Sequence, residues 1–463
     1  MTSRLPSRTA TTSASIWQDL PEADFRRDIL ALEKLTNAVP LESCVFSPHD
    51  WTPPASDYRS TRLSLIEEQR LADDTAYIAA VGEGAQSVAA ATVQEPKDPP
   101  TAKASIVITV ASMDAVDTPS QNFLRSIFSS LSPVTVESRE EVIEHLAASI
   151  ARHHRHRLLN RLRSARWVKP AYLARTHKKP LHADLPALVR RVNLVFGRRE
   201  RKQRRDVEAH LETLSTVLTA FEEPPTTDAA EDARRLALVR ACYHFCTSSA
   251  VADYYGRLRD LTPTSQVQAC LKTLHQTEKI AAYYRIPCSL VDLALAQPSL
   301  FTKVELNFLI PYEPTPLEEA FQPWASAAHV HAEISLAVHH DTAPTENSQL
   351  WQRPRCVGAS KYLCYLCYLF VKHHGAYFPS ATHGACYDQW TVPDLADFPE
   401  ALRHRYAGVL RAMNGDVRAA CVNATRRPEP MTSRENLLDM LGKSTDDKTA
   451  EDTQSKDIGL EHP

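Results

Sequence analysis

Hydrophobic residues along the chain follow two spacings, which separate predicted helices from predicted strands. Apolar positions about every three to four residues predict helices, whereas alternation or a short β-branched run predicts strands. The helical spacing predicts helices over residues 16–39, 138–165, 185–218, 230–258, 265–284 and 394–413. The strand signals fall at residues 104–110, 303–308, 355–359 and 376–378. The chain is therefore predicted to be α/β, with a helix-rich N-terminal region and a mixed C-terminal part.

Several terminal signals refine these elements. Ser138 and Glu141 have the spacing of a capping box, and Asn414-Gly415 is expected to stop the helix before it. Proline pairs and polar stretches mark the boundaries between regions. We expect a disordered tail over 1–15, a helix-rich region over 16–225, a helical connecting region over 226–300, an α/β domain over 301–426 and a second disordered tail over 427–463.

Composition narrows the class of protein. Hydrophobic residues make up 43% of the 463 residues, which suits a chain with a sizeable core. No apolar run approaches the roughly 18 residues of a membrane span, and the first fifteen residues lack the apolar centre of a secretory signal. The 10 cysteines show no dense spacing, which favours a reducing compartment. We expect an intracellular protein, cytoplasmic or nuclear, with Cys242 and Cys246 in its core.

The net charge of −3 conceals a strongly basic segment. Between Arg152 and Arg205 there are eighteen Lys or Arg and two acidic residues, Asp184 and Glu200. The densest part is 198–205. Such a block is typical of phosphate binding, of a nuclear-import signal, or of a long solvated helix. Single-stranded DNA or RNA is therefore one expected partner, and a free nucleoside is the other.

A metal-binding pattern lies in the C-terminal part. His331-Ala332-Glu333 is followed by Cys364-Tyr365-Leu366-Cys367. Imidazole and thiolate are ligands that zinc prefers, and three protein ligands leave one position open, as in catalytic zinc sites. Cys364 and Cys367 share one face of a helical first turn, where the helix dipole favours thiolates.

Other residues match parts of this pattern. His210-Leu211-Glu212 also has the H-x-E form, so the cysteines carry the specificity. His329, His339 and His340 are alternative ligands. Of these and His331, only His331 is followed two residues later by a Glu. Thiol redox chemistry is a third interpretation of the cysteine pair, but its surroundings lack the thioredoxin β-α-β pattern.

The residues around the cysteines resemble a known superfamily. Gly358 to Cys367 (GASKYLCYLC), His383-Gly384 and Trp390-Thr391-Val392-Pro393 resemble a mainly fungal branch of the zinc-dependent cytidine-deaminase-like proteins. The resemblance covers about Lys303 to Pro393. It implies a three-layer α/β/α domain that holds zinc between two helix N-termini. Leu363 stands where the superfamily has proline, so the identity of the base is not carried over.

Together these features predict a zinc-dependent hydrolytic deaminase of a cytosine- or adenine-type base, in nucleic acid or nucleoside. We expect His331, Cys364 and Cys367 to bind Zn²⁺ and Glu333 to carry protons. Weaker candidates for the substrate pocket are Tyr362, Tyr365, His383 and Trp324. The alternative is a catalytically inactive deaminase-fold zinc protein that binds partners. The presence of Glu333 counts against that alternative, because a structural zinc site needs no proton carrier.

Overall fold

The computed structural model describes residues 15–52, 61–82, 84, 87–98, 104–170, 179–344, 349–430 and 432–439. Almost all of the predicted N-terminal tail, residues 1–14, lies outside the described residues, as do residues 440–463 of the predicted C-terminal tail. None of the described helices is long and apolar enough to cross a membrane.

A four-stranded sheet forms the centre of the molecule, with the strand order β4-β3-β2-β7. Its strands are β2 (Ala89–Gln94), β3 (Ile106–Ser112), β4 (Val304–Phe308) and β7 (Gly358–Ala359). β3 pairs antiparallel with β2 and parallel with β4, and β7 pairs antiparallel with β2. The strands predicted at 104–110 and 303–308 are confirmed. The sheet takes strands from both sides of the boundary expected at residue 301, so the α/β unit is discontinuous in sequence.

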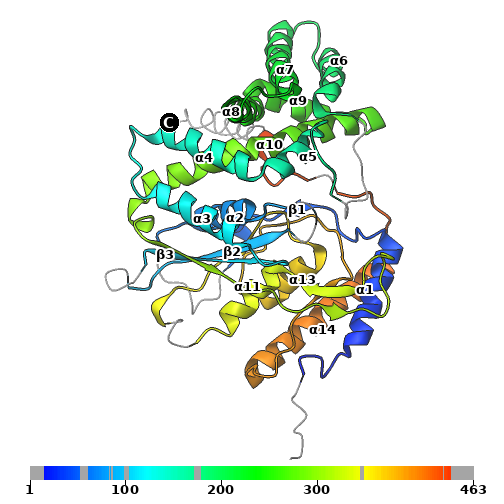
Figure 1. The fold of residues 1–463 in the computed structure, drawn as a ribbon. Helices are drawn as coiled ribbons and strands as arrows, with labels where there is room; N and C mark the ends of the chain where they lie inside the picture. The colour runs from blue at the N-terminus through cyan, green and yellow to red at the C-terminus, as the bar shows by residue number, and fades with distance from the viewer. Residues whose placement is uncertain are drawn as a thin grey trace, which may run out of the picture.

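Helices cover both faces of this sheet and make three layers (Figure 1). Helix α2 (Leu65–Ala79) packs on one face against β2 and β7, and α11 (Ala332–Asp341) packs on the other face against β2 and β3. Because both faces are covered, β3 is buried along its whole length. Helix α14 (Glu400–Val422) packs against α13 (Tyr365–His374) and α1 (Glu22–Thr36).

The chain between β3 and β4 forms a helical assembly beside the sheet (Figure 1). Its helices are α3 (Thr118–Leu131), α4 (Arg139–His153), α5 (Arg155–Leu162), α6 (Leu185–Val195), α7 (Arg201–Glu222), α8 (Asp228–Cys246), α9 (Ser249–Arg259) and α10 (Ser265–Ala296). Helix α10 contacts α2, so the assembly and one face of the sheet share a continuous core. Cys242 and Cys246 lie in that core, as predicted.

Short strands and turns complete the described structure. β1 (Cys44–Val45) pairs with β8 (Ala381–Thr382). β6 (Ala327–Val330) pairs with β5 (Thr315–Pro316) and with β9 (Trp390–Thr391). Single 3-10 turns occupy 48–50, 181–184 and 298–300. Of the strand predicted at 376–378, only a bridge between Cys356 and Phe378 forms.

Local sequence signals failed where packing or a different hydrogen bond decided the outcome. The predicted capping box is wrong, because the Ser138 hydroxyl accepts a hydrogen bond from the backbone of Thr135 and does not cap the helix. Helix α14 continues through Asn414-Gly415, where Asn414 is buried in the packed helix. Tertiary packing overrides the weak local preference of these two residues. The single helix predicted at 185–218 is two helices, α6 and α7.

Gly358 permits the close packing of α2 on the sheet edge. A Cβ atom at this position would lie 2.3 Å from the backbone carbon of Ala72 and 2.3 Å from the backbone nitrogen of Asp73. Only glycine therefore allows the backbones of β7 and α2 to approach this closely.

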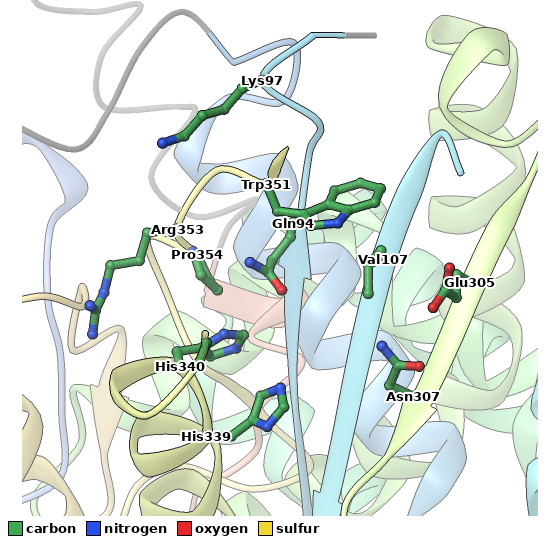
Figure 2. A pocket seen from close by; sticks show the side chains of 11 residues that line it. Gln94, Lys97, Val107, Glu305, Asn307, His339, His340, Trp351, Arg353 and Pro354 are labelled. Atoms are coloured by element: carbon green, nitrogen blue, oxygen red, sulfur yellow. The ribbon is translucent and has the colours of Figure 1, made fainter. Parts of the chain in front are cut away.

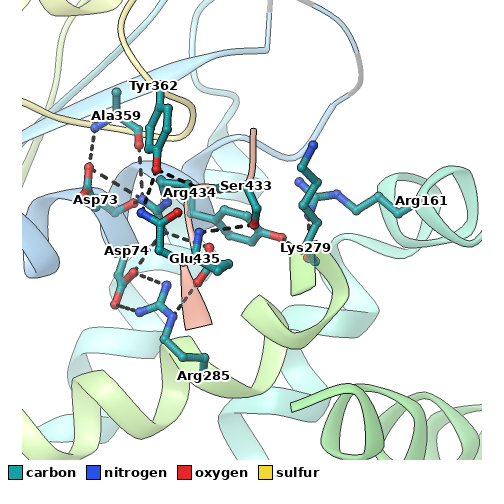
Figure 3. Close-up of polar contacts among 12 residues, drawn as sticks. Asp73, Asp74, Arg161, Lys279, Arg285, Ala359, Tyr362, Ser433, Arg434 and Glu435 are labelled. Carbon is teal, nitrogen blue, oxygen red and sulfur yellow. Dashed lines mark hydrogen bonds and ion pairs between the residues drawn. The ribbon is translucent and has the colours of Figure 1, made fainter. Parts of the chain in front are cut away.

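Residues 432–439 return to the core, which differs from the disordered tail expected beyond residue 426. Arg434 and Glu435 form ion pairs with Asp74 on α2 and Arg285 on α10 (Figure 3). Leu438 is also buried in the main core. This segment therefore belongs to the folded part of the chain, because its charged and apolar side chains both find buried partners.

Candidate metal centre

The N-termini of α11 and α13 hold the residues with the predicted metal-binding pattern. β6 ends at Val330 and α11 begins at Ala332, so His331 is the N-cap residue between them. Cys364 is the N-cap residue of α13, and its Sγ accepts a hydrogen bond from the backbone nitrogen of Cys367 at 3.3 Å. The positive ends of both helix dipoles therefore lie at the same place, where they favour thiolates.

The three donor atoms have the spacing of a zinc site. His331 Nδ1 lies 3.6 Å from Cys364 Sγ and 3.4 Å from Cys367 Sγ, and all three donors lie within 4.8 Å of one another. Zinc bonds of about 2.0 Å to nitrogen and 2.3 Å to sulfur, at a tetrahedral angle, separate such atoms by about 3.6 Å. Both cysteines are buried and His331 is partly exposed, so the donor set fits zinc.

Electrostatics at the centre favour a negatively charged sulfur. Burial alone would raise the pKa of Cys364, but the hydrogen bond from Cys367 and the charge of His331 hold that pKa well below its usual range. Burial lowers the pKa of His331, whereas the neighbouring Cys364 more than offsets this and raises it. The thiolate is the form of cysteine that binds zinc, so this lowered pKa suits Cys364 to the role of a metal ligand.

Glu333 lies beside the donors without being one of them. It is the second residue of α11 and is 4% exposed, and its Oε2 lies 3.5 Å from Cys367 Sγ. Burial raises the pKa of the Glu333 carboxyl, and the positive charge of His331 only partly opposes this. A carboxyl group with a raised pKa, close to a metal but not bound to it, is suited to carry a proton.

The alternative histidines lie elsewhere. His329 is on β6, where its backbone nitrogen donates to the Gln389 carbonyl. His339 and His340 are at the far end of α11 and line a cavity of about 270 Å³ (Figure 2). His340 Nε2 lies 2.8 Å from the hydroxyl of Thr92 on β2. His210 is on α7, in the helical assembly.

Of the weaker pocket candidates, His383 is the one whose pKa is affected by the charges of Cys364 and His331 at the metal centre. Its Nδ1 accepts a hydrogen bond from the Ala385 backbone at 3.1 Å, and burial lowers the pKa of the ring. A neutral imidazole held in this way carries its proton on Nε2. Tyr362 instead places its hydroxyl between Ser433 and Asn436 of the C-terminal segment.

The remaining two candidates are Tyr365 and Trp324, and their exposure does not suit the wall of a substrate pocket. Tyr365 is buried in the core between helices, and Trp324 is 74% exposed. Sequence reasoning missed two further residues. Tyr387 is 41% exposed and its ring lies 6.0 Å from that of His383. Glu33 on α1 accepts a hydrogen bond from the backbone of Asp388, and burial followed by Asp388 raises its pKa to about 9.

Both residues escaped sequence reasoning for a simple reason. Glu33 is some three hundred positions from Cys364 in the chain, although the negative charge of Cys364 contributes to its raised pKa. Tyr387 follows the His383-Gly384 pair and carries no motif of its own. A short-range signal existed only for Tyr387, as an aromatic residue close to a pocket candidate.

Residues 330–394 match the model of the OTT_1508-like deaminase family. The matched region contains the three donors, Glu333 and His383, so the C-terminal part of the α/β unit is deaminase-like. Nothing among curated proteins or solved structures matches the chain.

Proposed function

We propose that this protein is a zinc-dependent hydrolytic deaminase of a cytosine- or adenine-type base, in a nucleoside or in nucleic acid. One observation carries the proposal. The donor atoms of His331, Cys364 and Cys367 converge at zinc-like distances, and the Glu333 carboxylate lies 3.5 Å from one of them. A structural site would be closed by a fourth protein ligand, and among the described residues the group contains three.

The chemistry follows from the donor set. When bound, zinc supplies the Lewis acidity that makes water a nucleophile at neutral pH. The Glu333 carboxylate accepts the proton of that water and delivers it to the ring nitrogen of the base. A C–O bond forms at the amino-bearing carbon, Glu333 then moves the remaining hydroxyl proton to the amino nitrogen, and the C–N bond breaks to release ammonia and leave a carbonyl.

Glu333 is placed for this role by the fold. Glu333 is in the first turn of α11, two residues after His331, so its carboxylate is held close to the metal donors. Burial excludes bulk water from this carboxylate. His383 offers its Nε2 proton as a hydrogen-bond donor, because its Nδ1 is already occupied by the Ala385 backbone. We propose that His383 orients the base through a hydrogen bond and that the exposed ring of Tyr387 stacks on the base.

Glu333→Gln tests the mechanism. The variant should retain zinc and fold, since the three donors are untouched, but release at least about a hundredfold less ammonia. The substrates are cytidine, adenosine, their monophosphates and single-stranded oligonucleotides. The matched control is His329→Gln, a neighbour outside the donor group, which should keep zinc and activity.

Two results would contradict the proposal. A fully active Glu333→Gln enzyme would rule out Glu333 as the proton carrier. Zinc-loaded wild-type protein that releases no ammonia from any of these substrates would favour the alternative of a deaminase-fold binding protein.

A further inference from the structure

Four cationic side chains gather near the loop that follows α2. Arg157 and Arg161 come from α5, Lys279 from α10, and Lys361 from the segment between β7 and α13. They are brought together from three separate parts of the chain. Arg157 is 7% exposed. Lys361 is exposed as a residue, although its ammonium group at the end of the side chain is desolvated.

Defined contacts hold this cluster in place. Arg157 donates to the backbone carbonyl of Ala80 and Lys361 Nζ donates to that of Gly84 at 3.2 Å, so both cations bind the same loop. The guanidinium groups of Arg157 and Arg161 lie 4.6 Å and 5.4 Å from the centre of the Tyr77 ring.

Arg161 and Lys279 are direct neighbours in the cluster. Arg161 Nη1 donates to the backbone carbonyl of Lys279 at 2.5 Å, and the two side chains lie side by side in Figure 3. Gln276 fixes the position of Arg161 by donating to its backbone carbonyl at 2.6 Å. The cations are thus held by backbone groups and an aromatic ring.

Among the described residues, the four clustered cations form no ion pair, unlike the cations of a neighbouring network. Arg285 and Arg434 lie against Asp74 and Glu435 in buried ion pairs (Figure 3). By contrast, across the part of the chain that the structure describes, no carboxylate oxygen lies within 4.0 Å of the four clustered cations. An anion bound there would compensate these charges.

The charges also act on one another. Burial, followed by the charge of Arg161, lowers the pKa of Lys279 to about 8. Desolvation of its ammonium group, followed by the neighbouring arginines, lowers the pKa of Lys361 to about 8. Both lysines therefore pay an electrostatic cost for their positive charge, which a bound anion would remove.

Lys361 connects the cluster to the metal centre. It is three residues before Cys364, and Ser360 fixes the backbone there by pairing with Ala89 of β2 at 2.9 Å. Burial lowers the pKa of His383, and the charge of Lys361 adds to this while that of Cys364 opposes it. His383 is therefore within electrostatic range of both the cluster and the metal donors.

We propose that the cluster of Arg157, Arg161, Lys279 and Lys361 binds a phosphate group of the substrate. This inference rests on the proposed deaminase function and narrows its substrate class from nucleosides to phosphate-bearing nucleotides. Guanidinium and ammonium groups are the side chains that bind phosphate in proteins, through short charge-assisted hydrogen bonds. The phosphate comes either from a mononucleotide or from the backbone of a single strand.

Calorimetry tests the inference in the zinc-loaded Glu333→Gln protein, in which substrate is not turned over. The probes are inorganic phosphate, cytidine and adenosine, their 5′-monophosphates and a single-stranded oligonucleotide. Phosphate-bearing probes should bind at least about tenfold more tightly than nucleosides at low salt, and this advantage should shrink at high salt. Binding of the oligonucleotide alone would identify a strand as the source of the phosphate, and binding of the monophosphates would identify a mononucleotide.

Variants of the cluster provide the specific test. Lys361→Gln and Lys279→Gln should each weaken binding of phosphate-bearing probes about tenfold, while nucleoside binding stays unchanged. Arg161→Lys should keep most of the affinity that Arg161→Gln loses. The control is Lys303→Gln, an exposed lysine beside β4 at the opposite sheet edge from β7, which should bind like the parent.

Wild-type-like binding of every phosphate-bearing probe by a folded Lys361→Gln protein would overturn the inference. So would the absence of any phosphate-dependent gain over nucleosides. These failures are separable from failure of the proposed function, because ammonia release is measured independently. If the protein deaminated nucleosides but bound no phosphate, the proposed deaminase function would stand and only the phosphate-binding role of the cluster would be wrong.

Discussion

Glu435 provides a quantitative test of the C-terminal segment, which the sequence predicts to be disordered and the structure packs into the core. Its carboxylate is 2% exposed and accepts a hydrogen bond from Arg285 Nε at 2.6 Å. Arg285 also binds Asp74 through two hydrogen bonds of 2.6 Å. Glu435→Gln preserves the shape of the side chain and removes one negative charge from this buried network.

The size of the effect follows from the pKa of Glu435. Burial raises this pKa, but Arg285 and Arg434 together lower it from 4.5 to about 2. The difference of 4.5 − 2 = 2.5 units, at about 1.36 kcal/mol per unit, corresponds to ~3 kcal/mol of stability. Removing one partner of a buried ion pair costs about 3–5 kcal/mol in other proteins, which agrees.

The assay is urea unfolding at pH 7, followed by tryptophan fluorescence and circular dichroism, with coincident transitions as the check for two-state behaviour. The free energy of unfolding of Glu435→Gln should be lower by ~3 kcal/mol. Because the folded-state pKa is depressed, this contribution is present above pH 4.5 and is lost as the pH falls toward 2. The difference between wild type and variant should therefore narrow in that range.

Glu319→Gln is the matched control. Glu319 is 70% exposed and pairs with Lys34 at the surface, so its loss should change stability by less than about 1 kcal/mol. If Glu435→Gln unfolded with the same free energy as wild type at pH 7, the buried network would contribute nothing. If deletion of residues 427–463 left the free energy of unfolding unchanged, the result would support the predicted disordered tail over the packed segment.

Three further predictions concern the metal, the sheet edge and the basic segment. Cys367→Ser should lower bound zinc from one per chain in elemental analysis, and a chelator should lower the melting temperature of wild type but not of this variant. Gly358→Ala should destabilise the fold by roughly 1–3 kcal/mol because its Cβ meets the α2 backbone at 2.3 Å, whereas Gly408→Ala, in open space on α14, should not. Glutamine at the six cations of 198–205 should weaken oligonucleotide binding and flatten its salt dependence, with zinc content unchanged, and an unaltered salt slope would exclude this block as a contact. The six cations are Arg198, Arg199, Arg201, Lys202, Arg204 and Arg205.

The basic segment shows how the structure divides a feature that is continuous in sequence. Its dense part begins α7, which lies at the far end of the helical assembly from α11 and α13 (Figure 1). Several other cations form ion pairs with acidic side chains, such as Arg163 with Asp184 and Arg152 with Asp232. Arg157 and Arg161 instead belong to the cluster near the metal centre. A count of charges along the chain cannot separate the cations at the start of α7, the ion-paired cations and the clustered cations, because each environment depends on the direction in which a helix faces.

The sequence by itself determined two strands of the central sheet and the chemistry of the donor set. The strands at 104–110 and 303–308 could be predicted because β-branched runs and alternation are local signals. His331, Cys364 and Cys367 could be proposed as ligands because imidazole and thiolate select zinc, and Glu333 because it lies two residues from His331. These inferences use neighbours in the chain, which the sequence contains directly.

Tertiary structure alone decided which distant segments meet. β2 and β3 join the sheet from across the predicted boundary at residue 301, and 432–439 returns to pair Glu435 with Arg285. Glu33 and Lys361 acquire their surroundings in the same way, from residues far away in the chain. Such contacts depend on burial and on charges brought together by packing. A one-dimensional pattern cannot show them, because the energy of each group depends on what lies around it in space.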